Sequence, residues 1–225
     1  MNRYSRNISS ISQEENLILN KSKVCVVGCG GLGGYIIEML GRLGVGSITG
    51  VDGDVFDETN LNRQLLSKEN TIGKSKAIEA QIRMADVNPH IKVIPIVEYL
   101  NESNAVDILK DHQVIVDALD NIPSRLILQE FSSKLNIPLV HGAIAGWYGQ
   151  VSTIFPNDMT LDKIYRKDES YGLEKELGNP SFTPALISSI QVSEVVKILI
   201  NRGYLLRNKL LFINTLNHEY DLIDL

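Results

Sequence analysis

The chain alternates between two hydrophobic patterns. Short runs of consecutive apolar residues recur, and between them lie longer stretches in which apolar residues return every three or four positions. The short runs predict buried strands, and the longer stretches predict amphipathic helices. Regular alternation of strand and helix predicts an α/β fold of the Rossmann-like, doubly wound type with a mostly parallel sheet. The strands are expected at residues 24–27, 48–51, 91–97, 113–118 and 137–141, and the helices at residues 32–43, 73–87, 102–110 and 124–135.

The pattern changes after residue 149. The last two strand patterns follow each other without a helix between them, which predicts antiparallel C-terminal strands at the edge of the sheet. The later strand patterns lie at residues 150–155, 209–214 and 220–225, with one long helix pattern at residues 184–202.

Two segments show no regular spacing of apolar residues. Residues 156–180 are charged and predict a variable crossover loop over the site, or a partly ordered segment. Residues 1–20 are expected to form an N-terminal arm. No internal repeat occurs, so we expect a single domain over residues 1–225.

Composition narrows the class of protein. With 44% hydrophobic residues, 225 residues can bury a substantial core. The balance of 22 basic against 27 acidic residues gives a net charge of −5, which argues mildly against nucleic acid as a partner. The sequence has no apolar stretch of signal-peptide length at its start and no uncharged apolar run near about 20 residues, so we expect a cytoplasmic protein without a membrane segment.

A glycine-rich loop follows the first predicted strand and opens the first predicted helix. A turn of this kind directs backbone N–H groups and the positive end of the helix dipole at one place, which suits phosphate. Asp52 ends the next strand 24 positions after Gly28 (52 − 28), where a Rossmann unit carries its ribose-binding acid. The loop reads Val27-Gly28-Cys29-Gly30-Gly31-Leu32-Gly33.

A set of polar residues follows Asp52 closely. A redox dinucleotide would leave Arg63 and Lys76 without a role, whereas a nucleoside triphosphate uses both cations. Lys76 lies at the start of a predicted helix that also contains Lys74, so by itself it is more typical of a solvated lysine. Asp120 follows a predicted strand and, on the sequence alone, could simply cap the helix that begins near Pro123.

These motifs occur in an order that resembles the ThiF/MoeB (HesA) adenylyltransferases, which are relatives of ubiquitin-activating enzymes. The resemblance extends over nearly the whole chain. The matching segments are Arg3-Tyr4-Ser5-Arg6-Asn7, Gly28-Cys29-Gly30-Gly31-Leu32-Gly33, Asp52-Gly53-Asp54, Thr59-Asn60-Leu61-Asn62-Arg63-Gln64, Gly73-Lys74-Ser75-Lys76, Asn88-Pro89, Asp117-Ala118-Leu119-Asp120-Asn121 and His141-Gly142-Ala143.

The resemblance implies a reaction and a set of roles. The C-terminal Gly-Gly carboxylate of a small ubiquitin-like sulfur-carrier protein would attack the α-phosphate of ATP with Mg²⁺ and release pyrophosphate. Arg63 and Lys76 would hold the triphosphate, and Asp120 would bind Mg²⁺. Arg6 resembles the arginine that this family inserts into the partner subunit's site, which implies a homodimer. The other implied nucleotide-binding residues are Gly28, Gly30, Gly31, Gly33, Asp52, Asn60, Gln64 and Asn121.

The chain departs from the family at its cysteines. Many members carry two Cys-x-x-Cys pairs that bind a structural zinc, whereas this sequence has only Cys25 and Cys29. Four soft ligands cannot be assembled, so we expect no structural zinc. The downstream cysteine that some relatives join to the activated carrier is also missing. We therefore expect the reaction to stop at the acyl-adenylate, with the sulfur supplied by another protein.

Other function classes stay open at this point. A nicotinamide-dependent oxidoreductase would use the glycine loop but leave Arg63, Lys76 and Asp120 without roles. A non-catalytic scaffold usually loses such residues, and here all are kept. Activation of a carboxylate on modified tRNA is a further alternative, against which the acidic balance weighs. The motifs do not distinguish carriers for thiamine, molybdopterin or related cofactors.

Overall fold

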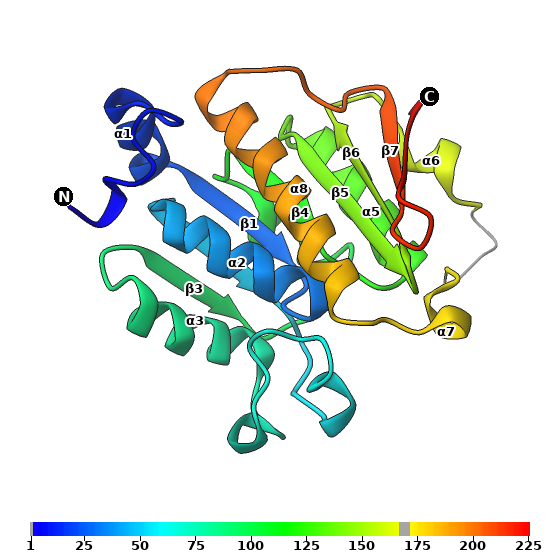
Figure 1. Ribbon diagram of the computed structural model, residues 1–225, viewed down its shortest axis with the longest axis horizontal. Helices are drawn as coiled ribbons and strands as arrows, with labels where there is room; N and C mark the ends of the chain where they lie inside the picture. The colour runs from blue at the N-terminus through cyan, green and yellow to red at the C-terminus, as the bar shows by residue number, and fades with distance from the viewer. Residues whose placement is uncertain (1, 167–171) are drawn as a thin grey trace.

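The computed structural model of the protein describes residues 2–166 and 172–225. Its strands are β1 (Lys23–Val27), β2 (Ser47–Val51), β3 (Lys92–Ile96), β4 (Val114–Asp117), β5 (Leu139–Ala145), β6 (Tyr148–Ile154), β7 (Lys209–Asn214) and β8 (Glu219–Asp224). They form one sheet in the order β3-β2-β1-β4-β5-β6-β7-β8 (Figure 1). The first five strands in this order are parallel, and β6, β7 and β8 add antiparallel pairs. The predicted fold class is therefore confirmed.

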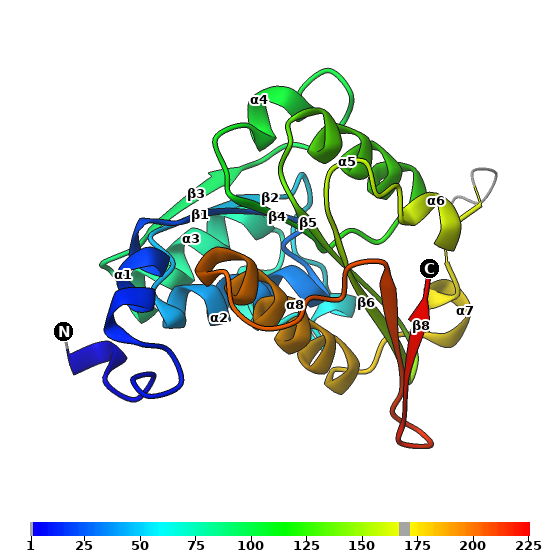
Figure 2. The same cartoon turned by 90° about the horizontal axis from the view of Figure 1, so that it is seen from above.

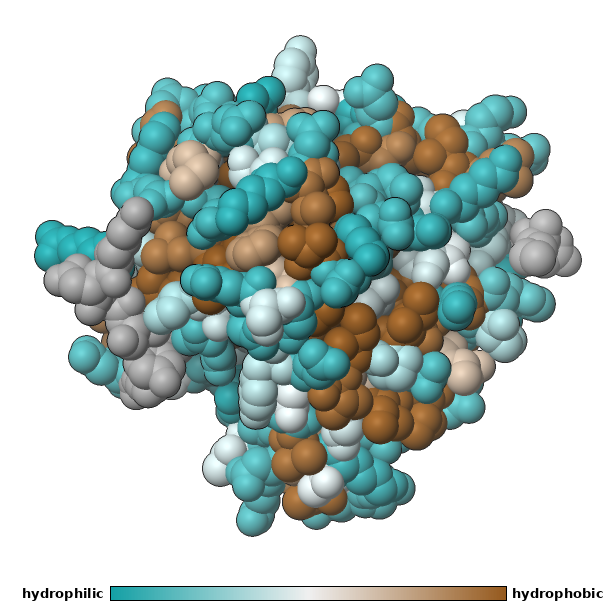
Figure 3. All heavy atoms as spheres, turned by 180° about the vertical axis from the view of Figure 1, so that it is seen from behind, coloured by the Kyte–Doolittle hydropathy of each residue, from teal (hydrophilic) through white to brown (hydrophobic). Residues whose placement is uncertain are grey.

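Helices cover both faces of the sheet. The α-helices are α1 (Gln13–Lys21), α2 (Gly31–Leu43), α3 (Lys76–Val87), α4 (Ala105–Leu109), α5 (Ile122–Lys134), α6 (Leu161–Ile164), α7 (Glu174–Leu177) and α8 (Phe182–Ile200). Figure 2 shows α2, α3 and α8 on one face and α4, α5 and α6 on the other. From the side of α4 and α5, the surface carries several separate apolar groups among polar side chains (Figure 3).

Alternate strand residues face opposite sides, so the sheet separates two apolar cores. Val24 and Val26 of β1 pack in the core that includes α2 and α8, whereas Cys25 and Val27 pack in the core that includes α4 and α5. Helix α8 is long and apolar enough to cross a membrane by length and composition, but half of that stretch is buried within the protein. Its packing against α2 and β5 is that of a core helix.

Helix α3 begins three residues later than predicted. Gly73 has a φ of +80°, a left-handed conformation that favours glycine, and its N–H donates to the carbonyl oxygen of Phe56 at 2.8 Å. Ser75 then caps the helix by accepting the N–H of Ile78 at 3.5 Å. A turn therefore occupies positions that the apolar period assigns to the helix. Helix α4 is also shorter than the predicted 102–110.

The N-terminal arm contains a helix that was not predicted. Ser12 caps α1 by accepting the N–H of Glu15 at 3.1 Å, and the Glu15 carboxylate accepts the N–H of Ser12 at 2.7 Å. Upstream, the buried Tyr4 accepts a hydrogen bond from Asn88 Nδ2 at 2.9 Å. The arm is therefore fastened to the body of the domain.

The predicted loop at residues 156–180 is only partly a loop, because it contains α6 and α7. Asp158 forms an ion pair with Arg207, with N–O distances of 2.8 and 2.9 Å. Asp162 accepts a hydrogen bond from Gln129 Nε2 at 2.8 Å. These contacts fix the first half of the segment to the sheet and α5, and residues 167–171 lie outside the described residues.

The carboxyl ends of the parallel strands meet at one edge of the sheet. Val27 pairs with Val51 and with Asp117, and Val51 pairs with Ile96. The chain leaves β1 toward β2 on one side and reaches β4 on the other, which makes this edge a topological switch point. Ligands bind to α/β sheets at such points.

Candidate active site

The glycine loop lies at this edge, between β1 and α2. Gly28 has a φ of +99°, and a methyl group there would collide with the carbonyl oxygen of Ala118. A side chain at Gly33 would collide with the carbonyl oxygen of Gly28. Glycine is required at both positions because the loop, the helix and the turn after β4 approach so closely. The N-terminus of α2, at Gly30 and Gly31, opens into a cavity and suits an anion.

Asp52 joins the glycine loop to the turn after β2. Its Oδ2 accepts the N–H of Cys29 at 2.7 Å, and its Oδ1 accepts the N–H of Asp54 at 2.8 Å. Burial raises the pKa of Asp52, although both hydrogen bonds oppose that shift. Asp52 also lines the cavity, where its remaining lone pairs suit ribose hydroxyls.

Lys76 is the first residue of α3 and is buried, with 7% of its surface exposed. Its Nζ forms an ion pair with Asp54 Oδ2 at 3.0 Å, and the hydroxyl of Tyr99 donates to Asp54 Oδ1 at 2.5 Å. Partial burial favours the neutral acid, but the hydrogen bonds from Tyr99 and Lys76 outweigh it and lower the pKa of Asp54. The alternative of a solvated lysine is therefore wrong.

These groups surround a cavity of about 330 Å³. Most of the residues that the sequence assigns to nucleotide or metal line it, namely Gly28, Gly30, Gly31, Asp52, Arg63, Gln64, Lys76, Asp120 and Asn121. Within the described part of the chain, its lining does not include Gly33, Asn60 or Arg6. Gly33 serves the close packing described above. Asn60 Oδ1 accepts the N–H of Asp57 at 3.1 Å, in the cap of the 3₁₀ helix η2 (Glu58–Asn60).

Asp120 lies in the turn between β4 and α5 and is exposed at the cavity. The alternative that Asp120 caps α5 is wrong, because Asn121 is the cap and its Oδ1 accepts the N–H of Ser124 at 2.9 Å. Asn121 Nδ2 also donates a hydrogen bond to Asp120 Oδ1 at 3.4 Å. The helix cap therefore leaves the Asp120 carboxylate available for a ligand.

The carboxylate of Asp120 fits one kind of metal site. Among the residues that the structure describes, no group of three or more His, Cys, Asp or Glu side chains is arranged to hold a metal ion. Mg²⁺ in nucleotide sites does not need such a group, because it takes one or two carboxylates and completes its shell with phosphates and water. A single exposed carboxylate beside a phosphate cavity fits this donor set.

Behind the Asp120 turn lies a buried polar network that the sequence motifs did not reveal. His141 Nδ1 donates to Asp117 Oδ2 at 2.7 Å, and both side chains are fully buried. Burial favours a neutral Asp117, but the charge of Arg125 and the His141 hydrogen bond outweigh it and lower the pKa of Asp117. Burial lowers the pKa of His141, which favours the neutral imidazole. Its Nε2 is then an acceptor, 3.1 Å from Gln150 Nε2 and 3.3 Å from the Tyr165 hydroxyl.

A second cavity, of about 550 Å³, adjoins the first. The linings of the two cavities share Asp120, Arg125 and Ile144. The other walls of the second cavity are mainly apolar and come from β5, β6, β7, α5, α6 and α7, and from Tyr165, Gly172 and Leu173. A polar cavity and an apolar cavity therefore meet at Asp120.

Both cysteines are fully buried. Burial raises the pKa of the Cys25 thiol, and burial together with the charge of Asp52 raises that of Cys29. Neither thiol is in its reactive thiolate form at neutral pH.

Arg6 is distant from the cavity of its own chain. It follows Tyr4, which is anchored to Asn88 at the end of α3 opposite to Lys76. Arg3 is attached at the same end, since its Nη1 donates to the carbonyl oxygen of Val87 at 2.6 Å, and the 12 residues of α3 span about 18 Å. The folded arm therefore keeps Arg6 at the far edge of the sheet.

A model of the ThiF family matches residues 4–225, and the chain belongs to this family. It is 32% identical over 228 residues to the SAMP-activating enzyme E1 of Haloferax volcanii, covering 99% of this chain and 84% of that protein. It is 31% identical over 231 residues to the sulfur carrier protein adenylyltransferase of Thermus thermophilus, covering 98% and 85%. Some relatives are longer, and the chain covers 49% and 48% of two plant proteins.

The fold is also known from solved structures. E. coli MccB with ATP matches with a TM-score of 0.84 and 20% sequence identity, covering 100% of this chain and 71% of that chain. At this level of identity the match concerns the fold, including the antiparallel strands that follow the parallel part of the sheet.

Proposed function

We propose that this protein adenylylates the C-terminal carboxylate of a small ubiquitin-like sulfur-carrier protein that ends in Gly-Gly, with ATP as the second substrate. The observation that carries the proposal is the junction of the two cavities at Asp120, Arg125 and Ile144. The polar cavity offers backbone N–H groups and cations, as a triphosphate requires. The apolar cavity suits a narrow peptide tail. An enzyme that only bound a redox cofactor would not need this second cavity. The name of the Thermus thermophilus relative supports the same substrate class.

In this reaction, a carboxylate oxygen of the tail attacks the α-phosphorus of ATP. A bond forms between that oxygen and the α-phosphorus, the bond from the α-phosphorus to the oxygen that bridges to the β-phosphate breaks, and pyrophosphate leaves. Both reactants are anions, so the rate depends on alignment and on neutralised charge. We assign Arg63 and Lys76 to the triphosphate, Gln64 and the glycine loop to phosphate oxygens, and Asp52 to the ribose.

We assign Asp120 as the protein ligand of Mg²⁺, beside the phosphates of ATP. Magnesium, when bound there, would supply positive charge that favours the departure of pyrophosphate. Asp120 lies where the tail and the triphosphate would meet, which is the place where negative charge is concentrated.

We further propose a cytoplasmic homodimer in which Arg6 of each chain enters the cavity of the other. The support for this is the anchoring of Tyr4, two residues before Arg6, at the end of α3 remote from Lys76, together with the position of Arg6 in the family pattern. The net charge of −5 favours a protein partner over a nucleic acid, and no membrane partner is proposed.

Pyrophosphate exchange tests the proposed function directly. Purified ubiquitin-like carriers that end in Gly-Gly are expected to support exchange of labelled pyrophosphate into ATP in the presence of Mg²⁺. The same carriers without their last glycine are the matched control and are expected to give none. Absence of exchange with every carrier, together with reduction of NAD in the presence of a small substrate, would overturn the proposal in favour of an oxidoreductase.

Replacing both Cys25 and Cys29 by alanine is expected to leave exchange within about threefold of the wild-type rate, because buried thiols of raised pKa are poor nucleophiles. Mass spectrometry of the wild type with carrier and ATP is expected to find no thioester or acyl persulfide on the enzyme. A reducible carrier adduct at either cysteine would contradict this prediction, and each single variant would then identify the thiol.

A further inference from the structure

The network behind Asp120 has no role in the reaction described so far. We propose that Arg125 and Tyr165 are positioning residues, which fix the turn that presents Asp120 and link it to the wall of the second cavity. This inference rests on the proposed function, because it assigns Asp120 to the metal and the second cavity to the carrier tail.

The residue before Asp120 is held from both sides. The carbonyl oxygen of Leu119 accepts a hydrogen bond from Arg125 Nη2 at 2.5 Å. The N–H of Leu119 donates to Asp117 Oδ1 at 3.0 Å. Since Asp117 and Arg125 are both buried, with 0% and 6% of their surface exposed, water competes little for these bonds. The direction of the Asp120 carboxylate therefore depends on where the Arg125 guanidinium lies.

Tyr165 determines the place of that guanidinium. Its hydroxyl oxygen accepts hydrogen bonds from Arg125 Nη1 at 2.6 Å and from Gln150 Nε2 at 2.9 Å. The guanidinium carbon also lies 5.5 Å from the centre of the Tyr165 ring. A planar guanidinium can reach the Leu119 carbonyl and the Tyr165 hydroxyl at once, which a lysine ammonium on a single stem does not reproduce.

Tyr165 belongs to the segment between β6 and α8, and it lines the second cavity. The same segment is fastened through Asp158 to Arg207 and through Asp162 to Gln129. A peptide tail in the second cavity would therefore rest on the residue whose hydroxyl holds Arg125. In this way the Tyr165 hydroxyl, on the carrier side of the site, determines through Arg125 how Asp120 is placed on the nucleotide side.

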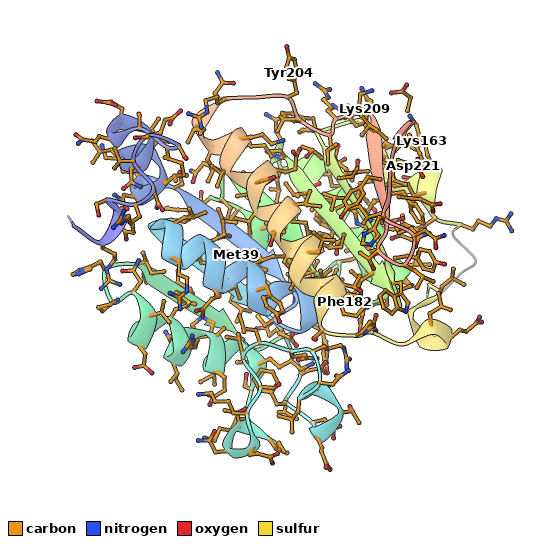
Figure 4. All side chains as sticks on the ribbon, in the orientation of Figure 1. Met39, Lys163, Phe182, Tyr204, Lys209 and Asp221 are labelled. Carbon is orange, nitrogen blue, oxygen red and sulfur yellow. The ribbon has the colours of Figure 1, made fainter. Side chains whose placement is uncertain are left out.

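Tyr165→Phe tests this role, because it keeps the ring and removes the hydroxyl. The matched control is Tyr204→Phe, since Tyr204 is 98% exposed and projects away from the body of the protein (Figure 4). ATP affinity is measured by calorimetry with Mg²⁺ and with EDTA, without any carrier, and turnover is measured by exchange. In Tyr165→Phe, the turnover number is expected to fall roughly tenfold, about the worth of one charge-assisted hydrogen bond, and the gain in ATP affinity that Mg²⁺ provides is expected to fall about threefold.

Three further results decide between positioning and general loosening. The affinity for ATP in EDTA is expected to stay within about twofold of wild type, since Tyr165 does not line the first cavity. The KM for the carrier is also expected to stay within about twofold, because Tyr165→Phe keeps the ring that forms part of the wall of the second cavity. Arg125→Lys, which keeps the charge, is expected to show the same selective loss. Equal losses with Mg²⁺ and with EDTA would overturn the positioning role, as would a Tyr165→Phe protein that behaves like Tyr204→Phe while the wild type is active. A wild type that binds no ATP would instead overturn the proposed function, and this inference with it.

Discussion

Replacing Asp120 by alanine is expected to lower the turnover number of adenylation about 30- to 1,000-fold, which corresponds to about 2–4 kcal/mol of transition-state stabilisation. The dissociation constant of ATP is expected to rise much less, within about fivefold. Positive charge that Asp120 holds at the leaving group acts mainly when the bond to pyrophosphate breaks, so its loss affects the transition state more than the bound substrate. Exchange kinetics and calorimetry with ATP, on the same preparations, measure the two quantities.

Two variants separate charge from shape. Asp120→Asn preserves the size of the side chain and is expected to be nearly as slow as Asp120→Ala, because an amide does not replace a carboxylate as a ligand for Mg²⁺. Asp86→Ala removes an exposed carboxylate from α3 and is expected to retain wild-type kinetics. Near-normal turnover in Asp120→Ala, or a loss confined to ATP affinity, would contradict the assignment of Asp120.

The sheet and the glycine loop could be predicted because their signals are local. Strands buried on both faces must be apolar throughout, so β1 and β4 appear as continuous runs. Gly28 and Gly33 are required by close approach of the backbone, and their spacing is visible in seven consecutive residues. Helix α1 also had a local signal, the capping box formed by Ser12 and Glu15, and periodicity alone did not reveal it.

The electrostatics of the site depend on contacts between distant segments and therefore had no such signal. Lys76 is buried at the cavity wall, where Asp54, from the turn after β2, forms an ion pair with it. Arg125 and Tyr165 are 40 positions apart and meet because the segment after β6 folds back over α5. A single sequence gives residue types and local periods, whereas such pairs arise from the way the elements pack together.

The second large prediction concerns Arg6 in the proposed homodimer. Arg6→Ala and Asp120→Ala are each expected to be nearly inactive as homodimers, if Arg6 acts in the cavity of the partner. A heterodimer of the two variants contains one cavity built from the intact Asp120 of one chain and the intact Arg6 of the other. With free exchange of subunits at equal amounts, about half of the dimers are heterodimers with one working site each. The exchange rate is therefore expected to recover to roughly one quarter of wild type, as an isologous pair with reciprocal contacts requires.

As a control, each variant alone is taken through the same subunit-exchange protocol. Each is expected to stay inactive. If Arg6 acted within its own chain, every chain in the mixture would lack either Arg6 or Asp120, and mixing would restore nothing. The folded arm makes that outcome the less expected one, because Tyr4 and Asn88 hold this part of the chain at the end of α3 remote from Lys76. Light scattering at the assay concentration completes the test, since a fully active monomer would leave Arg6 without a partner site to enter and would contradict the homodimer as well.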